Sequence, residues 1–441
     1  MSRIKIKKKT KTKTKTKTKT KTKTKTKTKT KSKTNAKTNA KTKTKSKTKN
    51  KTIFSQFTAR IIIKDNVGGI VADKDSIKEI LESIGATVEI VIYNDVKDKL
   101  TSKLFKKVNI QIFIEHVYEI EKIPAEHSYI FVNQEYISDW DIDLMKSGKL
   151  IPLCKTQEGL KTLHKLGIIN AKYVGFGNNR KNEYIDSITK LQNLFIHIVG
   201  ASPMKGTQLL IDTWIHKKIN HPLIITANNK SGGNTKLFNY WKSLKPRIRV
   251  LPDSILNKWE EWKKITNTKN ITLPQFQTID NCSVYFCNTV LDYNVIQFLQ
   301  SIAEIHMCPS LIEGWGQYID EGRRAKAIVL TLDAPPMNEL ICDSNSKSDS
   351  GILVKATRGP NMRQLLPYGW TQYFTKNPLY NKFLYNTYKS TQTDLYHGIS
   401  RILKMTTDQK QLLSMNGFKQ SQEDYNNFRI KFTTLILEHI K

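Results

Sequence analysis

Two successive series of short apolar strands alternate with amphipathic helices, and this alternation limits the fold more than any other feature of the chain. The first series opens with the apolar run Ala59–Lys64, continues with apolar residues at helical spacing over 77–84, and returns to an apolar run at Thr87–Tyr93. A strand, a helix and a second strand in this order form a parallel sheet. We therefore expect an α/β fold built from doubly wound parallel sheets.

The same pattern also predicts the domain organisation. Further strands of the first series are expected at Val108–Glu115, Tyr129–Asn133 and Leu150–Cys154. After a polar stretch the pattern restarts, with strands expected at Phe195–Gly200, Pro222–Ala227, Ser283–Cys287 and Ile305–Cys308. We predict an N-terminal Rossmann-like domain at 56–177, a linker at 178–192, a C-terminal Rossmann-like domain at 193–360, and a helical segment at 361–441 that packs back on the domains. Ligands of such sheets bind at the carboxyl ends of the strands, so the cleft between the two domains is the expected site.

The N-terminal residues have a composition of their own. Residues 1–52 contain 24 Lys or Arg and no Asp or Glu, whereas the remaining residues carry 49 basic and 38 acidic side chains. A Lys-Thr repeat has too little apolar surface to offset its ordering entropy, so we expect residues 1–55 to be a disordered basic tail. Two interpretations stay open: an electrostatic tether to nucleic acid or an anionic membrane surface, or a low-complexity segment without a selected role.

Several classes of protein are disfavoured by the sequence. No apolar run reaches the 18–20 residues that a membrane-spanning helix needs, and no apolar stretch near the start is typical of a signal peptide. The chain has five cysteines without a CxxC pair, which indicates neither a disulfide framework nor a zinc site. Cys282 and Cys287 stand five apart on an expected strand and so face opposite sides. We expect a cytoplasmic protein, with peripheral membrane or polyanion association open.

The segment that follows the strand at Ile305–Cys308 is the most informative for chemistry. Glu313 lies in a loop rich in small residues, and Glu321 lies eight residues later in the helix that begins near Gly316. Carboxylates in this arrangement can grip vicinal hydroxyls of one ligand, while backbone amides at the helix start face a bound anion. The alternative is an ordinary strand–loop–helix corner with two solvated acids.

Together with the strand and turn at Leu330–Leu340, this segment resembles the retaining GT-B glycosyltransferases of the large group-1/family-4 type. There the chain reads roughly Ser-x-x-Glu-Gly-Phe/Trp-Gly, followed by a Glu in the next helix and an acidic residue before an apolar pair. The residues in register are Ser310, Glu313, Gly314, Trp315, Gly316, Glu321 and Glu339. The resemblance implies a GT-B fold, in which two Rossmann-like domains face a cleft.

A second loop also resembles this family. Val199–Gly206 matches the family's Gly-Arg-x-x-x-x-Lys-Gly loop, where the two basic residues neutralise the donor diphosphate. Lys205 occupies the Lys position, but Ala201 stands at the Arg position and the loop is one residue shorter. Arg323 and Arg324 are candidates to replace that Arg, although we expect both to project from their helix into solvent.

The first series of strands and helices, in the N-terminal half, matches the family more loosely. Gly68 and Gly69 resemble the glycine-rich turn over which donor and acceptor pack. His116 stands where many relatives carry a cleft-facing His near the transferred sugar, and Glu135 follows a strand that faces the same cleft. Ordinary turn, core and surface roles stay open for all of them.

The resemblance implies transfer of a hexose from a nucleotide-sugar donor to an unidentified glycan, protein or lipid acceptor, with retention of configuration and without a metal or other cofactor. The implied catalytic residues are His116 and Glu313, and the implied donor-binding residues are Gly69, Lys205, Glu313, Gly314, Trp315, Gly316 and Glu321. Two alternatives stay open. One is a catalytically degenerate GT-B protein that binds a sugar or nucleotide, and the other is a nucleic-acid-associated protein that acts through its basic tail.

Overall fold

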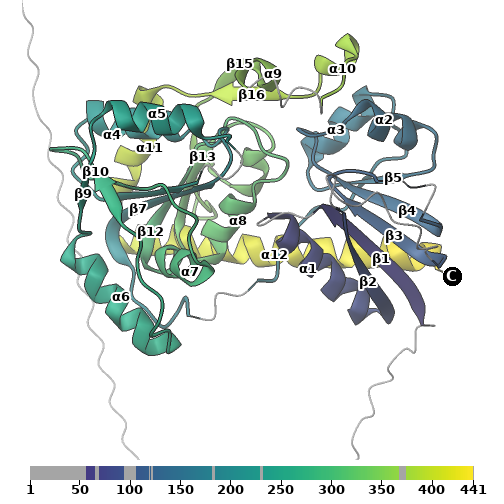
Figure 1. The fold of residues 1–441 in the computed structure, drawn as a ribbon, viewed down its shortest axis with the longest axis horizontal. Coiled ribbons are helices and arrows are strands. Elements are labelled where there is room, and N and C mark those ends of the chain that lie inside the picture. The colour runs from purple at the N-terminus through teal and green to yellow at the C-terminus, as the bar shows by residue number, and fades with distance from the viewer. Residues whose placement is uncertain are drawn as a thin grey trace, which may run out of the picture. The chain divides into compact units, whose positions relative to one another are not determined.

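The structure, a computed structural model, describes residues 56–64, 69–93, 106–118, 120, 123–180, 184–228, 232–366 and 374–440. The predicted tail and Gly68 lie outside these residues. The described part is organised around two sheets, each covered by helices (Figure 1).

The first sheet is parallel throughout, with strand order β2-β1-β3-β4-β5-β6. Its strands are β1 Phe57–Lys64, β2 Ala86–Tyr93, β3 Val108–Ile114, β4 Ala125–Val132, β5 Ile151–Cys154 and β6 Lys172–Tyr173. Its helices are α1 Gly69–Ser83, α2 Asp139–Lys146 and α3 Gln157–Lys165. β1 lies between β2 and β3 and is almost wholly buried, which explains its continuous apolar sequence. β4 begins four residues before the expected Tyr129 because its first residues form the more exposed end of the strand.

The second sheet has the order β14-β13-β12-β7-β8-β11-β10-β9. Its strands are β7 Leu191–Gly200, β8 Leu223–Ala227, β9 Arg247–Arg249, β10 Phe276–Thr278, β11 Val284–Cys287, β12 Ala303–Cys308, β13 Ile328–Leu332 and β14 Ile352–Val354. Its helices are α4 Thr207–His216, α5 Thr235–Ser243, α6 Asp253–Thr266, α7 Tyr293–Ile302, α8 Gln317–Arg324 and the 3-10 turn η2 Met337–Leu340. β10 pairs in antiparallel orientation with β9 and β11, and the other neighbouring strands of this sheet pair in parallel. β7 takes up the last two residues of the stretch expected as a linker.

The C-terminal part of the chain crosses between the two sheets twice. It contains β15 Thr357–Asn361, α9 Met362–Leu365, α10 Pro378–Asn381, β16 Asn386–Lys389, α11 Gln392–Leu403 and α12 Thr407–His439. Met362, Phe374 and Tyr385 are buried in one hydrophobic cluster with Phe113 and Ile130 of the first sheet. The antiparallel pair β15–β16 therefore departs from the helical expectation for 361–441, in a stretch rich in Asn, Tyr and Pro rather than in helix formers.

The second crossing is made by α12, which runs along both sheets (yellow in Figure 1). Near its middle, Asp424 forms an ion pair with Arg323 of α8, 2.7 Å between oxygen and nitrogen. Farther along, Phe428 and Phe432 pack edge-on against Phe131 of β4. The helix therefore ties the two sheets together. None of the helices in the described residues is both long and apolar enough to span a membrane.

Candidate functional site

Two loops of the second sheet meet at the carboxyl ends of neighbouring strands. β7 and β12 pair in parallel, so the loop 201–206 after β7 and the loop 309–316 after β12 leave the sheet at the same edge. The backbone N–H of Leu311 donates to the carbonyl of Met204 over 2.8 Å, which joins the two loops. This edge is where the family resemblance predicts the donor site.

Lys205 and Glu313 form an ion pair at this edge, with 2.5 Å between Nζ and Oε1. The same carboxylate oxygen accepts a hydrogen bond from Ser310 Oγ. Lys205 Nζ lies 4.2 Å from the ring centroid of Tyr318, whose hydroxyl lies 2.5 Å from Ser310 Oγ and accepts from the Ser310 backbone N–H. Lys205, Ser310, Glu313 and Tyr318 therefore form one hydrogen-bonded cluster, called the Lys205 cluster below. It offers a cation for phosphate and a carboxylate for sugar hydroxyls.

Glycines allow these loops to approach each other and to start the helices. Gly206 precedes α4 with φ +70°, and a Cβ there would collide with the carbonyl of Pro309. Gly316 precedes α8 with φ +103°, a backbone conformation that strongly favours glycine. The predicted helix start near Gly316 is thereby confirmed.

His197 of β7 lies next to the Lys205 cluster. The sequence did not indicate it as a site residue. Its Nδ1 donates to the carbonyl of Met307 over 2.7 Å, and its Nε2 accepts from Thr207 Oγ1 at 3.0 Å. Complete burial lowers the pKa of His197 to about 4, against the opposing effect of the Met307 hydrogen bond. The ring is therefore neutral and orients the first residue of α4. A single His in an apolar strand gives no sequence signal for this role.

The first sheet contributes residues 133–135, which follow β4, to the same region. Gln134 Nε2 donates to the backbone carbonyl of Glu313 over 3.2 Å. A Cβ on Gly314 would lie 2.6 Å from Glu135 Oε1 and 2.7 Å from Asn133 Oδ1. The backbone at Gly314 thus faces polar side chains of the first sheet at close range, which only glycine permits.

Glu135 is the most unusual side chain of this contact. It is 8% exposed, and its Oε2 has no hydrogen-bond partner in the structure. Burial raises the pKa of Glu135 to about 8, and the negative charges of Glu313 and Glu115 add to this effect. Its carboxyl group therefore holds a proton at neutral pH and can donate a hydrogen bond.

His116, predicted as catalytic, follows β3 and is placed by residues of its own domain. Its Nδ1 lies 3.6 Å from Asp141 Oδ2. Burial lowers the pKa of His116, but the hydrogen bond to Asp141 and the charges of Glu115 and Asp141 outweigh burial and raise it above its usual value. The structure gives His116 no direct contact with the Lys205 cluster.

Glu321, predicted to bind the donor, is held at both of its carboxylate oxygens. Gln317 Nε2 donates to one oxygen over 2.9 Å and Gln300 Nε2 to the other over 3.0 Å. Burial raises its pKa, against the effects of Arg324 and the two amides. A Cβ on Gly69, at the start of α1, would collide with Gln317 Oε1. The predicted Gly69 and Glu321 are thus brought into one chain of contacts, and Glu321 lines a small cavity together with Tyr318 of the Lys205 cluster.

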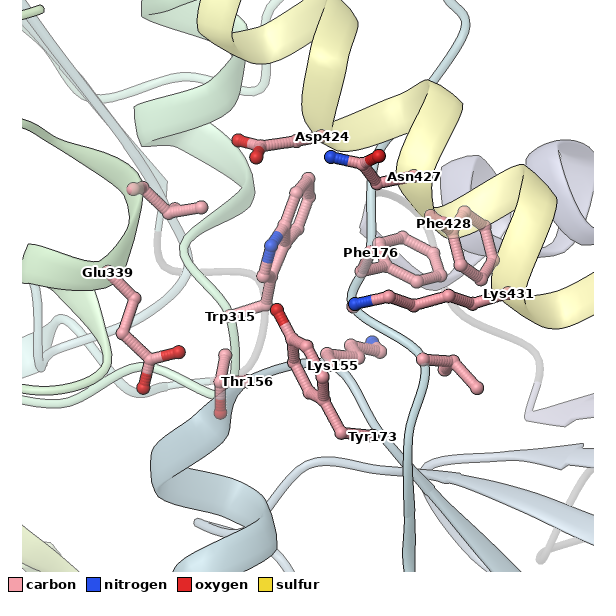
Figure 2. Close-up of a pocket in the computed structure, with 13 residues that line it drawn as sticks. Lys155, Thr156, Tyr173, Phe176, Trp315, Glu339, Asp424, Asn427, Phe428 and Lys431 are labelled. Atoms are coloured by element: carbon pink, nitrogen blue, oxygen red, sulfur yellow. The ribbon is translucent and has the colours of Figure 1, made fainter.

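Trp315 and Glu339 lie at a pocket between the sheets (Figure 2). The Trp315 indole packs edge-on against Phe176, with ring centroids 5.0 Å apart. The Glu339 carboxylate accepts the backbone N–H groups of Gln157 and Glu158 at 2.7 and 2.8 Å, at the N-terminus of α3. The pocket lining includes none of the Lys205 cluster, and the donor-binding role of Trp315 stays a prediction.

The expectation that Arg323 and Arg324 project into solvent is wrong. Arg323 is fully buried and is bound by Asp320, Asp424 and the Leu340 carbonyl. Arg324 donates to the carbonyl of Asn178 over 2.8 Å. Because both guanidinium groups are engaged in joining elements, neither replaces the Arg that the family has at position 201. Among the residues described, no group of three or more His, Cys, Asp or Glu is placed to hold a metal ion.

No protein-family model matches the sequence, and no curated protein matches it. Among solved structures, HepE from Anabaena in complex with UDP-glucose is 12% identical, covers 86% of this chain and 99% of its own, and has a TM-score of 0.51. Sucrose-phosphate synthase from Thermosynechococcus elongatus is 11% identical, with 86% and 98% coverage and a TM-score of 0.53. The UDP-forming α,α-trehalose-phosphate synthase from Burkholderia vietnamiensis is 9% identical, with 86% and 100% coverage and a TM-score of 0.53. At these identities the likeness establishes a shared fold, and the chain has the GT-B fold.

Proposed function

We propose that this protein is a glycosyltransferase that transfers a hexose from a nucleotide-sugar donor to an acceptor, with retention of anomeric configuration. The observation that carries the proposal is the Lys205–Glu313 ion pair at the edge where β7 and β12 end. Structural neighbours described as synthases of sucrose phosphate and trehalose phosphate, or found with UDP-glucose, support it.

Each residue has a role that follows from its chemistry. Lys205 and the backbone amides around Gly314 and Gly316 hold the diphosphate, so that the leaving group is neutralised without a metal. Glu313 accepts hydrogen bonds from hydroxyls of the transferred sugar. Glu321, oriented by Gln300 and Gln317, accepts from the ribose hydroxyls.

The chemical step requires stabilisation of two charges. Negative charge grows on the diphosphate as the glycosidic bond breaks, and the Lys205 ammonium stabilises it. Positive charge grows on an oxocarbenium-like sugar, and the Glu313 carboxylate stabilises that. His116, oriented by Asp141, serves as a contact to the transferred sugar on the first-sheet side.

A second candidate function is sugar or nucleotide binding without turnover. Ala201 supports it, because the described neighbours of Lys205 include no second cation and Arg323 and Arg324 are engaged elsewhere. Donor binding without release of nucleoside diphosphate, with any acceptor tried, favours this candidate over the enzyme.

Thermal unfolding of the full chain with UDP-, GDP- and ADP-sugars tests donor binding. We expect one nucleotide to raise the melting temperature, and Glu321→Ala to lose that increase because the ribose hydroxyls lose a charged acceptor worth about 1.5–3 kcal/mol. Glu260→Ala is the control, since Glu260 is exposed on α6 and, among the described residues, forms an ion pair with Lys263 of the same helix. An unchanged donor response in Glu321→Ala would contradict the assignment of Glu321.

A further inference from the structure

Three elements of the first domain and the crossing segment meet on one surface of the molecule. Lys146, at the end of α2, donates to the hydroxyl of Tyr380 in α10 over 2.7 Å. The carboxylate of Asp139, at the start of α2, accepts the backbone N–H of Lys376 over 3.0 Å. A Cβ on Gly167, in the turn after α3, would lie 3.8 Å from Lys146 Cε. Figure 1 shows α2, α3 and α10 close together.

These elements expose large apolar side chains. Trp140 in α2 is 48% exposed, Ile169 after α3 is 86% exposed, and Leu379 in α10 is 62% exposed, with Phe383 exposed beside them. A single exposed apolar residue is ordinary, but four on elements that touch one another form an apolar surface of the kind that binds a partner. We call this surface the Trp140 face.

The surroundings of the Trp140 face are basic. Exposed lysines lie on the same elements, namely Lys146, Lys149, Lys165, Lys376 and Lys382. The acidic side chains on the described residues of α2, α3 and α10 are fewer: Asp141 is buried, Asp139 is bound to Thr375 and Lys376, Glu158 is half-buried and Asp143 is exposed. The excess of positive charge complements an anionic partner.

Two of these lysines lie over aromatic rings of the face. Lys146 Nζ lies 4.7 Å from the ring centroid of Tyr380, and Lys165 Nζ lies 5.9 Å from that of Phe383. Ammonium groups beside aromatic rings suit a bilayer interface. There Trp and Tyr lie at headgroup level and ammonium groups contact lipid phosphates.

We propose that the Trp140 face docks this protein on the surface of an anionic lipid bilayer. Trp140, Ile169, Leu379 and Phe383 enter the headgroup region, and the surrounding lysines bind lipid phosphates. This surface is formed by folded elements, so it acts in addition to any attraction by the basic tail. It goes beyond the proposed transferase function and holds whether or not the chain transfers sugar.

Fluorescence quenching by brominated lipids in anionic vesicles tests the proposal on the full chain. The described tryptophans other than Trp140 are buried, namely Trp214, Trp241, Trp259, Trp262 and Trp315. We expect brominated phosphatidylglycerol vesicles to quench the emission of the unaltered chain, and Trp140→Phe to lose that quenching while it still sediments with the vesicles. A chain that sediments with vesicles but shows no quenching from Trp140 would overturn the proposal and leave the tail as the membrane-binding part.

Vesicle partitioning supplies the second arm of the test, at low salt and at a salt concentration that screens the tail. The double variant Ile169→Glu/Leu379→Glu should partition about tenfold less at high salt, because two apolar side chains no longer insert. Val250→Glu is the matched control, since Val250 is 76% exposed on the second domain. Equal partitioning of the double variant and the control would overturn the proposal. So would light scattering that shows a dimer for the unaltered chain and a monomer for the double variant, which would make the face a contact between two copies.

Discussion

Lys205→Ala removes the ammonium group that lies 2.5 Å from the Glu313 carboxylate and 4.2 Å from the Tyr318 ring. The two charged side chains are 16% and 10% exposed, so Glu313 is left with Ser310 as its hydrogen-bond partner in a largely buried position. Removal of one partner from a fully buried pair costs about 3–5 kcal/mol. Partial exposure and the remaining hydrogen bond reduce the expected loss of unfolding free energy to about 1–2 kcal/mol.

The same change should act more strongly on turnover. The leaving diphosphate gains charge in the transition state, so loss of its cation is expected to lower kcat about 100-fold and to weaken donor binding by less than tenfold. Release of nucleoside diphosphate gives kcat, and titration calorimetry gives the donor Kd. Lys217→Ala is the matched control, because Lys205 lies just before α4 and Lys217 just after it, and the Lys217 ammonium also lies over a tyrosine ring, 5.7 Å from the centroid of Tyr396.

A double variant separates the structural role of Lys205 from its chemical role. Lys205→Ala/Glu313→Gln carries no unpaired carboxylate, so its unfolding free energy should return to within about 1 kcal/mol of the original. Its turnover should stay low, because the Lys205 cation and the Glu313 carboxylate are both absent. Turnover that recovers together with stability, or a loss equal to that of Lys217→Ala, would refute the assignment of Lys205 to the diphosphate.

Three further predictions concern other parts of the molecule. Folded Glu135 has a pKa of about 8, above its usual 4.5, so the folded chain keeps a proton that the unfolded chain loses. The free energy of unfolding therefore falls by about 1 kcal/mol per pH unit between pH 5 and 8, and Glu135→Gln should flatten this slope in denaturant titrations. Asp424→Asn removes the charge that ties α12 to Arg323, and chemical denaturation should show a loss of about 1–2 kcal/mol, since Asp320 and the Leu340 carbonyl remain. Deletion of residues 1–52 should leave kcat on a small acceptor unchanged and abolish salt-sensitive retention on heparin; lost turnover in a folded chain would show that the tail contributes to catalysis.

The alternation of strands and helices was predictable because buried parallel strands need continuous apolar sequence. The strand that contains Ile61–Ile63 follows from local pattern alone. The two crossings of the C-terminal segment between the sheets could not be predicted from the local pattern. Phe428 and Phe432 look like ordinary helix positions, and only the structure shows that they pack on Phe131 of the first sheet.

The candidate site, like the fold, could be predicted from the sequence only in part. Lys205 and Glu313 were predicted from local motifs, and the pairing of β7 with β12 brings them together. Glu135 was predicted to face the cleft, but its contact with Gly314 could not be predicted, because the two residues are far apart in sequence and the contact depends on how the two sheets pack. Glu339 matched the motif by position, but its role at the N-terminus of α3 depends on the same packing.

The central claim is that a nucleotide-sugar bound at the Lys205 cluster is turned over with retention. The most direct measurement is proton NMR of the full chain with the donor that stabilises it and a panel of acceptors, which reports both transfer and the anomeric configuration of the product. We expect a product with the donor's anomeric configuration, formed by the original chain and about 100-fold more slowly by Lys205→Ala. An inverted product, or equal rates for the two chains, would contradict it.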